Sequence, residues 1–205
     1  MTHTLFVTYK CNWNCSYCIT DTHNQKEVSF QKILNQLVNI EDNSIIYLSG
    51  GEPGLLSYKK LETIFNIVKS KHCTLNVFTN GSIFKYKTLI KYIDYISYHC
   101  SENLDNFVEK VDIKNVTYNI VVSNTNKDNL DSFLEINKHI KFLVAGADDK
   151  DCLSKIDGIK IWMKYKNIIH EYSKEKLMCH YKFYKNNIKQ NNTMQEYSFK
   201  EQYKC

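Results

Sequence analysis

The sequence predicts an α/β fold in which six strands alternate with helices and lie parallel in one sheet. Short apolar runs recur along the chain, and most precede a longer segment with apolar residues three and four positions apart. Repeated strand–helix units favour a parallel sheet with helices outside it. Periodicity alone leaves open whether that sheet is flat or curled into a partial barrel.

The first half of the chain supplies three of these units. An apolar run predicts a strand at residues 5–8, and Ser29 then resembles the cap of a helix with apolar positions through residue 40. A buried strand at 45–48 precedes an amphipathic helix at 56–69. Alternating side chains predict a strand at 74–78, which a helix at 83–92 follows.

The same alternation continues to about residue 147. Strands are expected at 95–98, 116–122 and 140–145, and helices at 104–111 and 130–139. The lysine-rich remainder is less regular: residues 160–172 are expected to pack on the sheet, and 186–195 are polar enough for a mobile loop.

Composition limits the classes of function. The 205 residues, 43% of them hydrophobic, suit one domain with a substantial core, and no apolar run approaches the ~20 residues of a membrane span. No signal-peptide pattern opens the chain, so eight cysteines predict a reducing cytoplasm and metal binding or catalysis. All 27 basic residues are lysine, which disfavours specific nucleic-acid recognition because arginine reads guanine and grips phosphate.

Three cysteines, Cys11, Cys15 and Cys18, stand within eight residues after the first predicted strand. Three thiolates can hold three corners of a [4Fe–4S] cluster and leave one iron without a protein ligand. An open metal position is typical of a site that performs chemistry. Zinc, with His23 or His3 as fourth ligand, is an alternative, and so is a disulfide between two of the cysteines.

The spacing of three and then two residues between these cysteines resembles that of the radical S-adenosylmethionine (radical SAM) enzymes. In that family the open iron chelates SAM, and one electron splits SAM into methionine and a 5′-deoxyadenosyl radical. The resemblance implies a partial (β/α)6 TIM-like barrel over residues 1–147, with functional loops at the carboxyl ends of the strands. Residues 148–205 would form a short C-terminal extension that covers the barrel.

A second motif follows the second predicted strand. The run Ser49-Gly50-Gly51-Glu52-Pro53 contains the only proline of the chain. Taken alone, it would be an ordinary turn in which glycines let the backbone approach its neighbours. It also resembles the Gly-Gly-Glu-Pro motif of the radical SAM family, which implies that its backbone and the Glu52 carboxylate contact the amino end of SAM.

Further cofactor-binding residues are implied by the same resemblance. Thr79 and Asn80 lie in a Thr-Asn-Gly element after the third strand, whose alternative is a plain Asn-Gly turn. Ser101 and Asn124, after the fourth and fifth strands, are expected to reach the ribose or methionine carboxylate of SAM. The backbones of Tyr17 and Ala145 are expected to meet the adenine.

Other chemistry-bearing residues have less specific interpretations. Trp13 is expected to shield the cluster from water. Cys73 and Cys100 are expected to be small buried side chains, and His99 a structural histidine, with a role of Cys100 or His99 in substrate chemistry as the alternative. The scattered tail cysteines, Cys152, Cys179 and Cys205, leave open a reduced auxiliary-cluster region.

The resemblance fixes the first chemical step and leaves the substrate open. The leading prediction is hydrogen abstraction from a peptide or protein side chain, with an external electron donor such as flavodoxin or ferredoxin. A small-metabolite enzyme like the deazaguanine synthases is the second reading, with Asp21-Thr22 near that branch's Asp-Thr pair. A glycyl-radical-enzyme activase is the third, and an iron–sulfur or zinc-binding module without catalysis is the non-enzymatic alternative. No catalytic acid or base is assigned.

Overall fold

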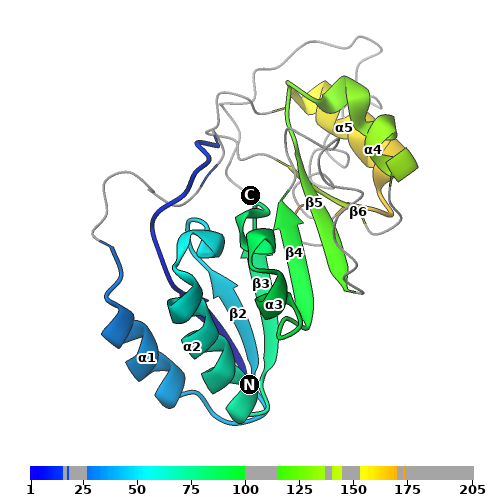
Figure 1. Ribbon diagram of the computed structural model, residues 1–205. Helices are drawn as coiled ribbons and strands as arrows, with labels where there is room; N and C mark the ends of the chain where they lie inside the picture. Colours follow the sequence, from blue (N-terminus) through cyan, green and yellow to red (C-terminus); the bar gives the residue numbers. More distant parts are fainter. Residues whose placement is uncertain are drawn as a thin grey trace, which may run out of the picture. The chain divides into compact units, whose positions relative to one another are not determined.

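The protein is an α/β fold with six strands in one sheet, ordered β1-β2-β3-β4-β5-β6 (Figure 1). The computed structural model describes residues 1–15, 18, 27–99, 115–136, 140–144, 153–169 and 173. The chain divides into two compact units, Met1–Tyr118 and Asn119–Cys205. The predicted fold class is confirmed. The predicted domain boundary at residue 147 lies outside the described residues.

Four parallel strands organise the first unit: β1 (Thr2–Phe6), β2 (Ile45–Ser49), β3 (Thr74–Thr79) and β4 (Tyr95–His99). The register places Phe6 opposite Ser49 and Thr79 opposite Tyr98. Because parallel strands end at the same edge of a sheet, the loops that follow β1, β2 and β3 are neighbours. These loops carry most of the described residues of the predicted site.

Three α-helices, α1 (Phe30–Val38), α2 (Tyr58–Ser70) and α3 (Lys87–Ile90), lie on one face of this sheet (Figure 1). Ser29 caps α1 by accepting a hydrogen bond from the Lys32 N–H. Strand residues that alternate along β1 to β4 are buried on one face, and α2 adds an apolar stripe three and four residues apart. This core comprises Leu5, Ile46, Leu48, Leu75, Val77, Ile96, Leu61, Ile64, Phe65 and Val68.

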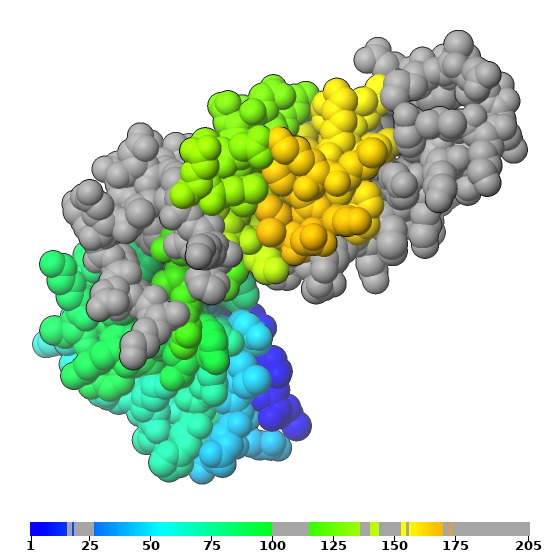
Figure 2. Space-filling view, turned by 90° about the vertical axis from the view of Figure 1, so that its right-hand side faces the viewer, coloured from blue at the N-terminus to red at the C-terminus, as the bar shows by residue number. Residues whose placement is uncertain are grey.

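The second unit holds most of β5 (Val116–Val122), then α4 (Leu130–Ile136), β6 (Ile140–Val144) and α5 (Lys155–Tyr165). The helices α4 and α5 lie side by side, as the yellow-green and yellow-orange surfaces in Figure 2 show. Asp131 on α4 joins them, since it pairs with Lys164 and accepts a hydrogen bond from the Tyr165 hydroxyl at 2.8 Å. The Tyr165 ring packs edge-on against Phe142 of β6.

Most expected elements are present, with changes at their ends. β1 begins at Thr2 rather than at residue 5, because the backbone of its polar first residues also pairs with β2. The expected helix at 83–92 is divided into a 3₁₀ helix, η2 (Ser82–Lys85), and α3, because the Tyr86 backbone leaves the helical region between them. The expected helix at 104–111 and loop at 186–195 lie outside the described residues. None of the helices in the described ranges is long and apolar enough to cross a membrane.

Candidate functional site

The loop after β1 carries Cys11, Cys15 and Cys18, none of which forms a disulfide. Cys11 and Cys15 are half-buried and Cys18 is exposed. The Cys18 N–H donates to the Cys15 carbonyl at 3.1 Å, and the Trp13 N–H donates to the Cys11 sulfur at 3.4 Å. Trp13 also packs edge-on against His99, with ring centroids 6.3 Å apart. The three predicted ligands therefore lie on one short loop at the carboxyl edge of the sheet.

The surroundings of Cys11 disfavour a free thiolate. Burial raises the pKa of the Cys11 thiol, the hydrogen bond from Trp13 opposes this rise, and the negative charges of Glu52 and Cys18 add to it. A bound metal deprotonates a coordinating thiol outright, so a raised pKa is compatible with a ligand role. Three thiols outside disulfides form a donor set that fits an iron–sulfur cluster.

Within the described part of the chain, no three His, Cys, Asp or Glu side chains are gathered around a common point that could hold a metal ion. The fit of the loop to a cluster therefore rests on the chemistry of its donors. His23, which could complete a zinc site, lies outside the described residues, and so does the predicted adenine contact Tyr17.

The two adjacent glycines after β2 pack directly against the loop after β1. The Gly51 N–H donates to the Thr8 carbonyl at 2.7 Å, and the Glu52 N–H donates to the Lys10 carbonyl at 2.8 Å. A Cβ atom at Gly51 would stand 2.3 Å from the Lys10 carbonyl oxygen, which is an impossible distance. Gly50 has a φ of +139°, where side chains are strained. The glycines thus allow the turn after β2 to bind the segment that leads into Cys11.

Glu52 is the buried centre of this edge, with 1% of its surface exposed. One carboxylate oxygen, Oε1, accepts from the Gly54 N–H and the Thr79 hydroxyl, both at 2.7 Å. The other, Oε2, accepts from the Asn80 N–H at 2.6 Å. Burial raises the pKa of Glu52, and the three hydrogen bonds, with the charge of Lys85, oppose that rise. The carboxylate therefore ties the turn after β2 to the end of β3.

Asn80, which follows β3, extends these contacts to the cysteine loop. Its side-chain nitrogen Nδ2 lies 2.9 Å from Asn12 Oδ1 and 3.8 Å from Cys11 Sγ. Its oxygen Oδ1 accepts from the Ser82 N–H at 3.3 Å and the Ser82 hydroxyl at 3.0 Å. Asn12 and Ser82 were missed by the sequence analysis. The position of Asn12 between two predicted ligands was the one local signal for it.

Three further residues singled out from the sequence, His99, Cys73 and Ser49, have different surroundings. Burial lowers the pKa of His99 to about 4, so its imidazole is neutral at pH 7. Cys73 is buried, as expected for a structural cysteine, and its thiol contacts the Glu41 carbonyl. Ser49 ends β2, and its carbonyl accepts a hydrogen bond from the Val7 N–H at 3.0 Å. Cys100 lies outside the described residues.

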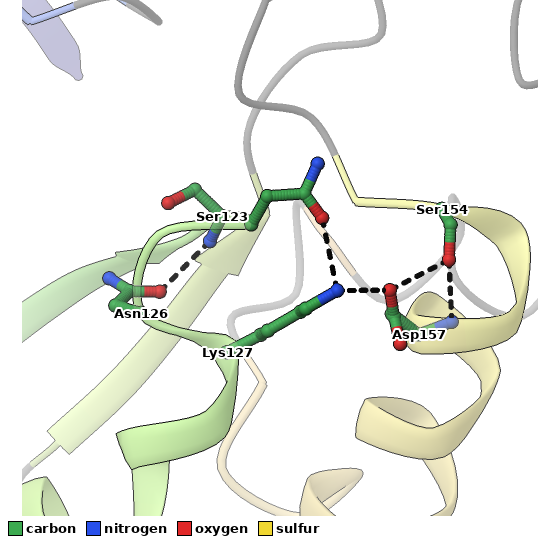
Figure 3. Close-up of polar contacts among 6 residues, drawn as sticks. Ser123, Asn126, Lys127, Ser154 and Asp157 are labelled. Atoms are coloured by element: carbon green, nitrogen blue, oxygen red, sulfur yellow. Dashed lines mark hydrogen bonds and ion pairs between the residues drawn. The ribbon is translucent and has the colours of Figure 1, made fainter.

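Asn124 belongs to a separate polar cluster in the second unit. Figure 3 labels the other members, Ser123, Asn126, Lys127, Ser154 and Asp157. The Lys127 ammonium lies 3.3 Å from Asn124 Oδ1 and 2.6 Å from the Asp157 carboxylate. Ser154, which caps α5, donates its hydroxyl to the same carboxylate at 2.7 Å. Asn126 holds the preceding turn by accepting from the Ser123 N–H at 3.0 Å. Ser101, Ala145 and the tail cysteines Cys152, Cys179 and Cys205 lie outside the described residues.

Residues 5–101 match the family described as the radical SAM superfamily, and this segment contains the cysteine loop, the turn after β2 and Asn80. These residues form a radical SAM domain. Enzymes of this superfamily use a [4Fe–4S] cluster and SAM. The chain is also similar to 7-carboxy-7-deazaguanine synthase of Haemophilus influenzae, at 34% identity over 88 residues, 43% of this chain and 38% of that relative.

Two solved structures share the fold at low sequence identity. One is native anSMEcpe with bound AdoMet and Cp18Cys peptide, with a TM-score of 0.58, 13% identity, and coverage of 78% of this chain and 56% of that one. The other is Streptococcus suis SuiB bound to precursor peptide SuiA, with a TM-score of 0.51, 13% identity, and coverage of 95% and 47%. The chain therefore spans only about half the length of these two proteins.

Proposed function

We propose that this chain is a radical SAM enzyme in which Cys11, Cys15 and Cys18 hold a [4Fe–4S] cluster. When bound, the cluster supplies one electron for the reductive cleavage of SAM, after which hydrogen is abstracted from the substrate. The three cysteines contribute thiolates, and they leave one iron open for SAM. The superfamily match over residues 5–101 and the chemistry of three cysteine thiols outside disulfides on one loop support this assignment.

The turn after β2 has two roles in this proposal. Its backbone, from Ser49 to Glu52, lines the carboxyl edge beside the cysteine loop and is proposed to contact the amino end of SAM. The Glu52 carboxylate holds Thr79 and Asn80 in place, because all three of its described hydrogen bonds come from Gly54, Thr79 and Asn80. The remaining assignments to SAM, namely Tyr17, Thr79, Asn80, Ser101, Asn124 and Ala145, stay predictions.

The observation that carries the proposal is the joining of three sequence motifs at one edge of the sheet. The cysteine loop, the Gly50–Glu52 turn and the Thr79–Asn80 segment contact one another through the hydrogen bonds of Thr8, Lys10, Glu52 and Asn80. A zinc or electron-transfer module does not require a glycine turn packed on its metal loop. The glycines are needed here because they let the turn after β2 and the metal loop form one connected edge.

The test is SAM cleavage by protein purified and reconstituted with iron and sulfide under anaerobic conditions. With SAM and dithionite, the wild-type protein is expected to form 5′-deoxyadenosine, and Cys15→Ala is expected to form none because one corner of the cluster is lost. Cys73→Ala is the matched control, since Cys73 is buried outside the loop and is expected to keep both cluster and cleavage.

Three results would contradict the proposal. SAM cleavage retained in Cys15→Ala would overturn the ligand assignment. Equal loss in Cys73→Ala would attribute the effect to folding rather than to a ligand. Wild-type protein that binds only zinc would exclude the cluster.

The substrate is proposed to be a peptide or protein side chain, because two solved structures that share the fold contain bound peptides. The similarity to a deazaguanine synthase supports a small metabolite as the second candidate. An external electron donor such as flavodoxin or ferredoxin is proposed to reduce the cluster in the cell. The protein is proposed to act in the cytoplasm.

Protease treatment separates the two candidates. A cell extract that stimulates 5′-deoxyadenosine formation is expected to lose this effect after digestion if the substrate is a peptide. Stimulation that survives digestion and passes a small-molecule filter would favour the metabolite.

A further inference from the structure

We propose that the Asn80 side chain donates a hydrogen bond to the Cys11 sulfur and thereby raises the reduction potential of the cluster that Cys11 helps to hold. The inference rests on the proposed function, in which Cys11 is a cluster ligand. It gives Asn80 a positioning and tuning role toward the metal site, distinct from a contact with SAM.

The geometry places an N–H donor at the sulfur. Asn80 Nδ2 lies 3.8 Å from Cys11 Sγ and 2.9 Å from Asn12 Oδ1. An amide nitrogen carries two hydrogens, so one can point at the sulfur while the other is donated to Asn12. The second donor to the same sulfur is the Trp13 N–H, at 3.4 Å. Cys11 therefore has donors from two separate segments of the chain.

The orientation of the Asn80 amide follows from its neighbours. Its oxygen accepts from the Ser82 backbone N–H, which can only donate. Exchanging the amide oxygen and nitrogen would place a donor against that N–H and an acceptor against Asn12 Oδ1. Both contacts would then be lost, so the nitrogen belongs on the side of Cys11.

The backbone around Asn80 is held as well. The Glu52 carboxylate accepts from the Asn80 N–H at 2.6 Å, and the Thr79 hydroxyl accepts from the Gly81 N–H at 3.0 Å. Glu52 and Thr79 are both buried. Buried groups thus hold the backbone at Asn80, and the contacts with Ser82 and Asn12 orient its side chain toward the sulfur.

The physical effect follows from charge. Adding an electron makes a thiolate-bound cluster more negative, and an N–H donor at a ligand sulfur stabilises the more negative state. Such contacts around a ligand are known to tune metal sites. Removing the Asn80 donor is therefore expected to lower the midpoint potential.

Redox titration of the reconstituted cluster, followed by electron paramagnetic resonance without SAM, tests the proposal. Asn80→Asp keeps the shape and the oxygen that accepts from Ser82 but replaces the donor with a negatively charged oxygen. Asn80→Ala removes the donor without adding charge. At a fixed potential, both variants are expected to lower the ratio of reduced to oxidised cluster roughly three- to tenfold. This range corresponds to the net free energy of one hydrogen bond. A tenfold change equals about 59 mV for one electron.

The controls separate hydrogen bonding from loop positioning. Asn12→Ala removes the 2.9 Å contact and leaves Nδ2 beside the sulfur. Ser82→Ala removes the hydroxyl that faces the Asn80 and Asn12 oxygens but keeps the Ser82 N–H that orients the Asn80 amide. Both are expected to titrate like the wild type.

Each unfavourable result has one meaning. An equal shift in Asn12→Ala, or a shift in Asn80→Asp without one in Asn80→Ala, would overturn the inference. If Asn80→Ala fails to fold, an unshifted potential in Asn80→Asp would overturn it equally. A wild-type protein that assembles no cluster would instead refute the proposed function.

Discussion

In the first unit, the Glu52 carboxylate holds the loops at the carboxyl edge of the sheet, and in the second unit the Asp157 carboxylate holds a polar cluster. The pKa shifts in the two regions favour opposite charge states. Around the cysteine loop, burial raises the pKa of Glu52 and lowers that of His99, so both shifts favour the uncharged form. In the second unit, the hydrogen bond to Asp157 raises the pKa of Lys127, and the hydrogen bond from Lys164 lowers that of Asp131, so both shifts favour the charged form.

The difference teaches which contacts carry stability. Glu52 receives neutral donors in a buried place, where a lost acceptor leaves those donors unpaired at high cost. The Lys127–Asp157 pair is partly exposed, with side-chain exposures of 26% and 20%, so water competes with it. The edge around Glu52 and His99 should therefore respond strongly to single substitutions and to pH, whereas the Lys127–Asp157 pair should respond weakly and mainly to salt.

The largest effect is expected from Glu52→Ala. The substitution leaves the Gly54 and Asn80 N–H groups and the Thr79 hydroxyl without their acceptor, which should cost about 3 kcal/mol of unfolding free energy. Urea unfolding followed by fluorescence measures it, in a Trp162→Phe background so that Trp13 reports on the first unit. Glu41→Ala, at an exposed glutamate, is the control. A loss below about 1 kcal/mol would mean that Glu52 does not hold this edge.

A pH effect of intermediate size is expected from His99. The pKa of His99 is about 4 in the folded protein and ordinarily 6.5. Between pH 4 and 6.5, the His99 imidazole is therefore protonated more readily in the unfolded chain than in the folded protein. Stability contributed by neutral His99 is present above pH 6.5 and is lost as the pH falls toward 4, by on the order of 2 kcal/mol. Unfolding titrations from pH 7 to 4 should show a smaller loss in His99→Gln. An unchanged slope in that variant would assign the loss to other groups.

The smallest effect is expected from the Lys127–Asp157 pair. A double-mutant cycle with Lys127→Met and Asp157→Asn should give a coupling of about 0.5 kcal/mol. About 1 M salt should reduce that coupling, since it screens partly exposed charges. If this coupling were as large as the stability loss in Glu52→Ala, the two regions would not differ in how strongly their polar contacts stabilise the fold.

The sequence was a good guide to elements and a poor one to contacts between them. Apolar runs overlapped every described strand because each strand buries apolar residues in the core, at alternate positions along β1 to β4. Ser29 located the start of α1. The division of residues 83–92 into η2 and α3 was not predictable, because it depends on the backbone angles of Tyr86.

The sequence predicted most described residues of the candidate site but not the hydrogen bonds that join them. The motifs placed the cysteines, the glycine turn and Asn80 at strand ends, and the register of β1, β2 and β3 brings those ends together. The link from Asn80 to Cys11 spans 69 positions of sequence, and no local pattern encodes it. The burial of Glu52 was not predictable either, because its hydrogen bonds with Thr79 and Asn80 also join distant parts of the sequence.

The contact of Gly51 with the loop after β1 has a consequence for dynamics. The Gly51 and Glu52 amide protons are held by the Thr8 and Lys10 carbonyls, so neither can exchange with solvent unless the two loops separate. Both protons should therefore exchange in one cooperative opening, at one rate under conditions where that opening limits exchange. The segment that precedes Cys11 and the turn after β2 then behave as a single folding unit, although 40 residues of sequence lie between Lys10 and Gly51.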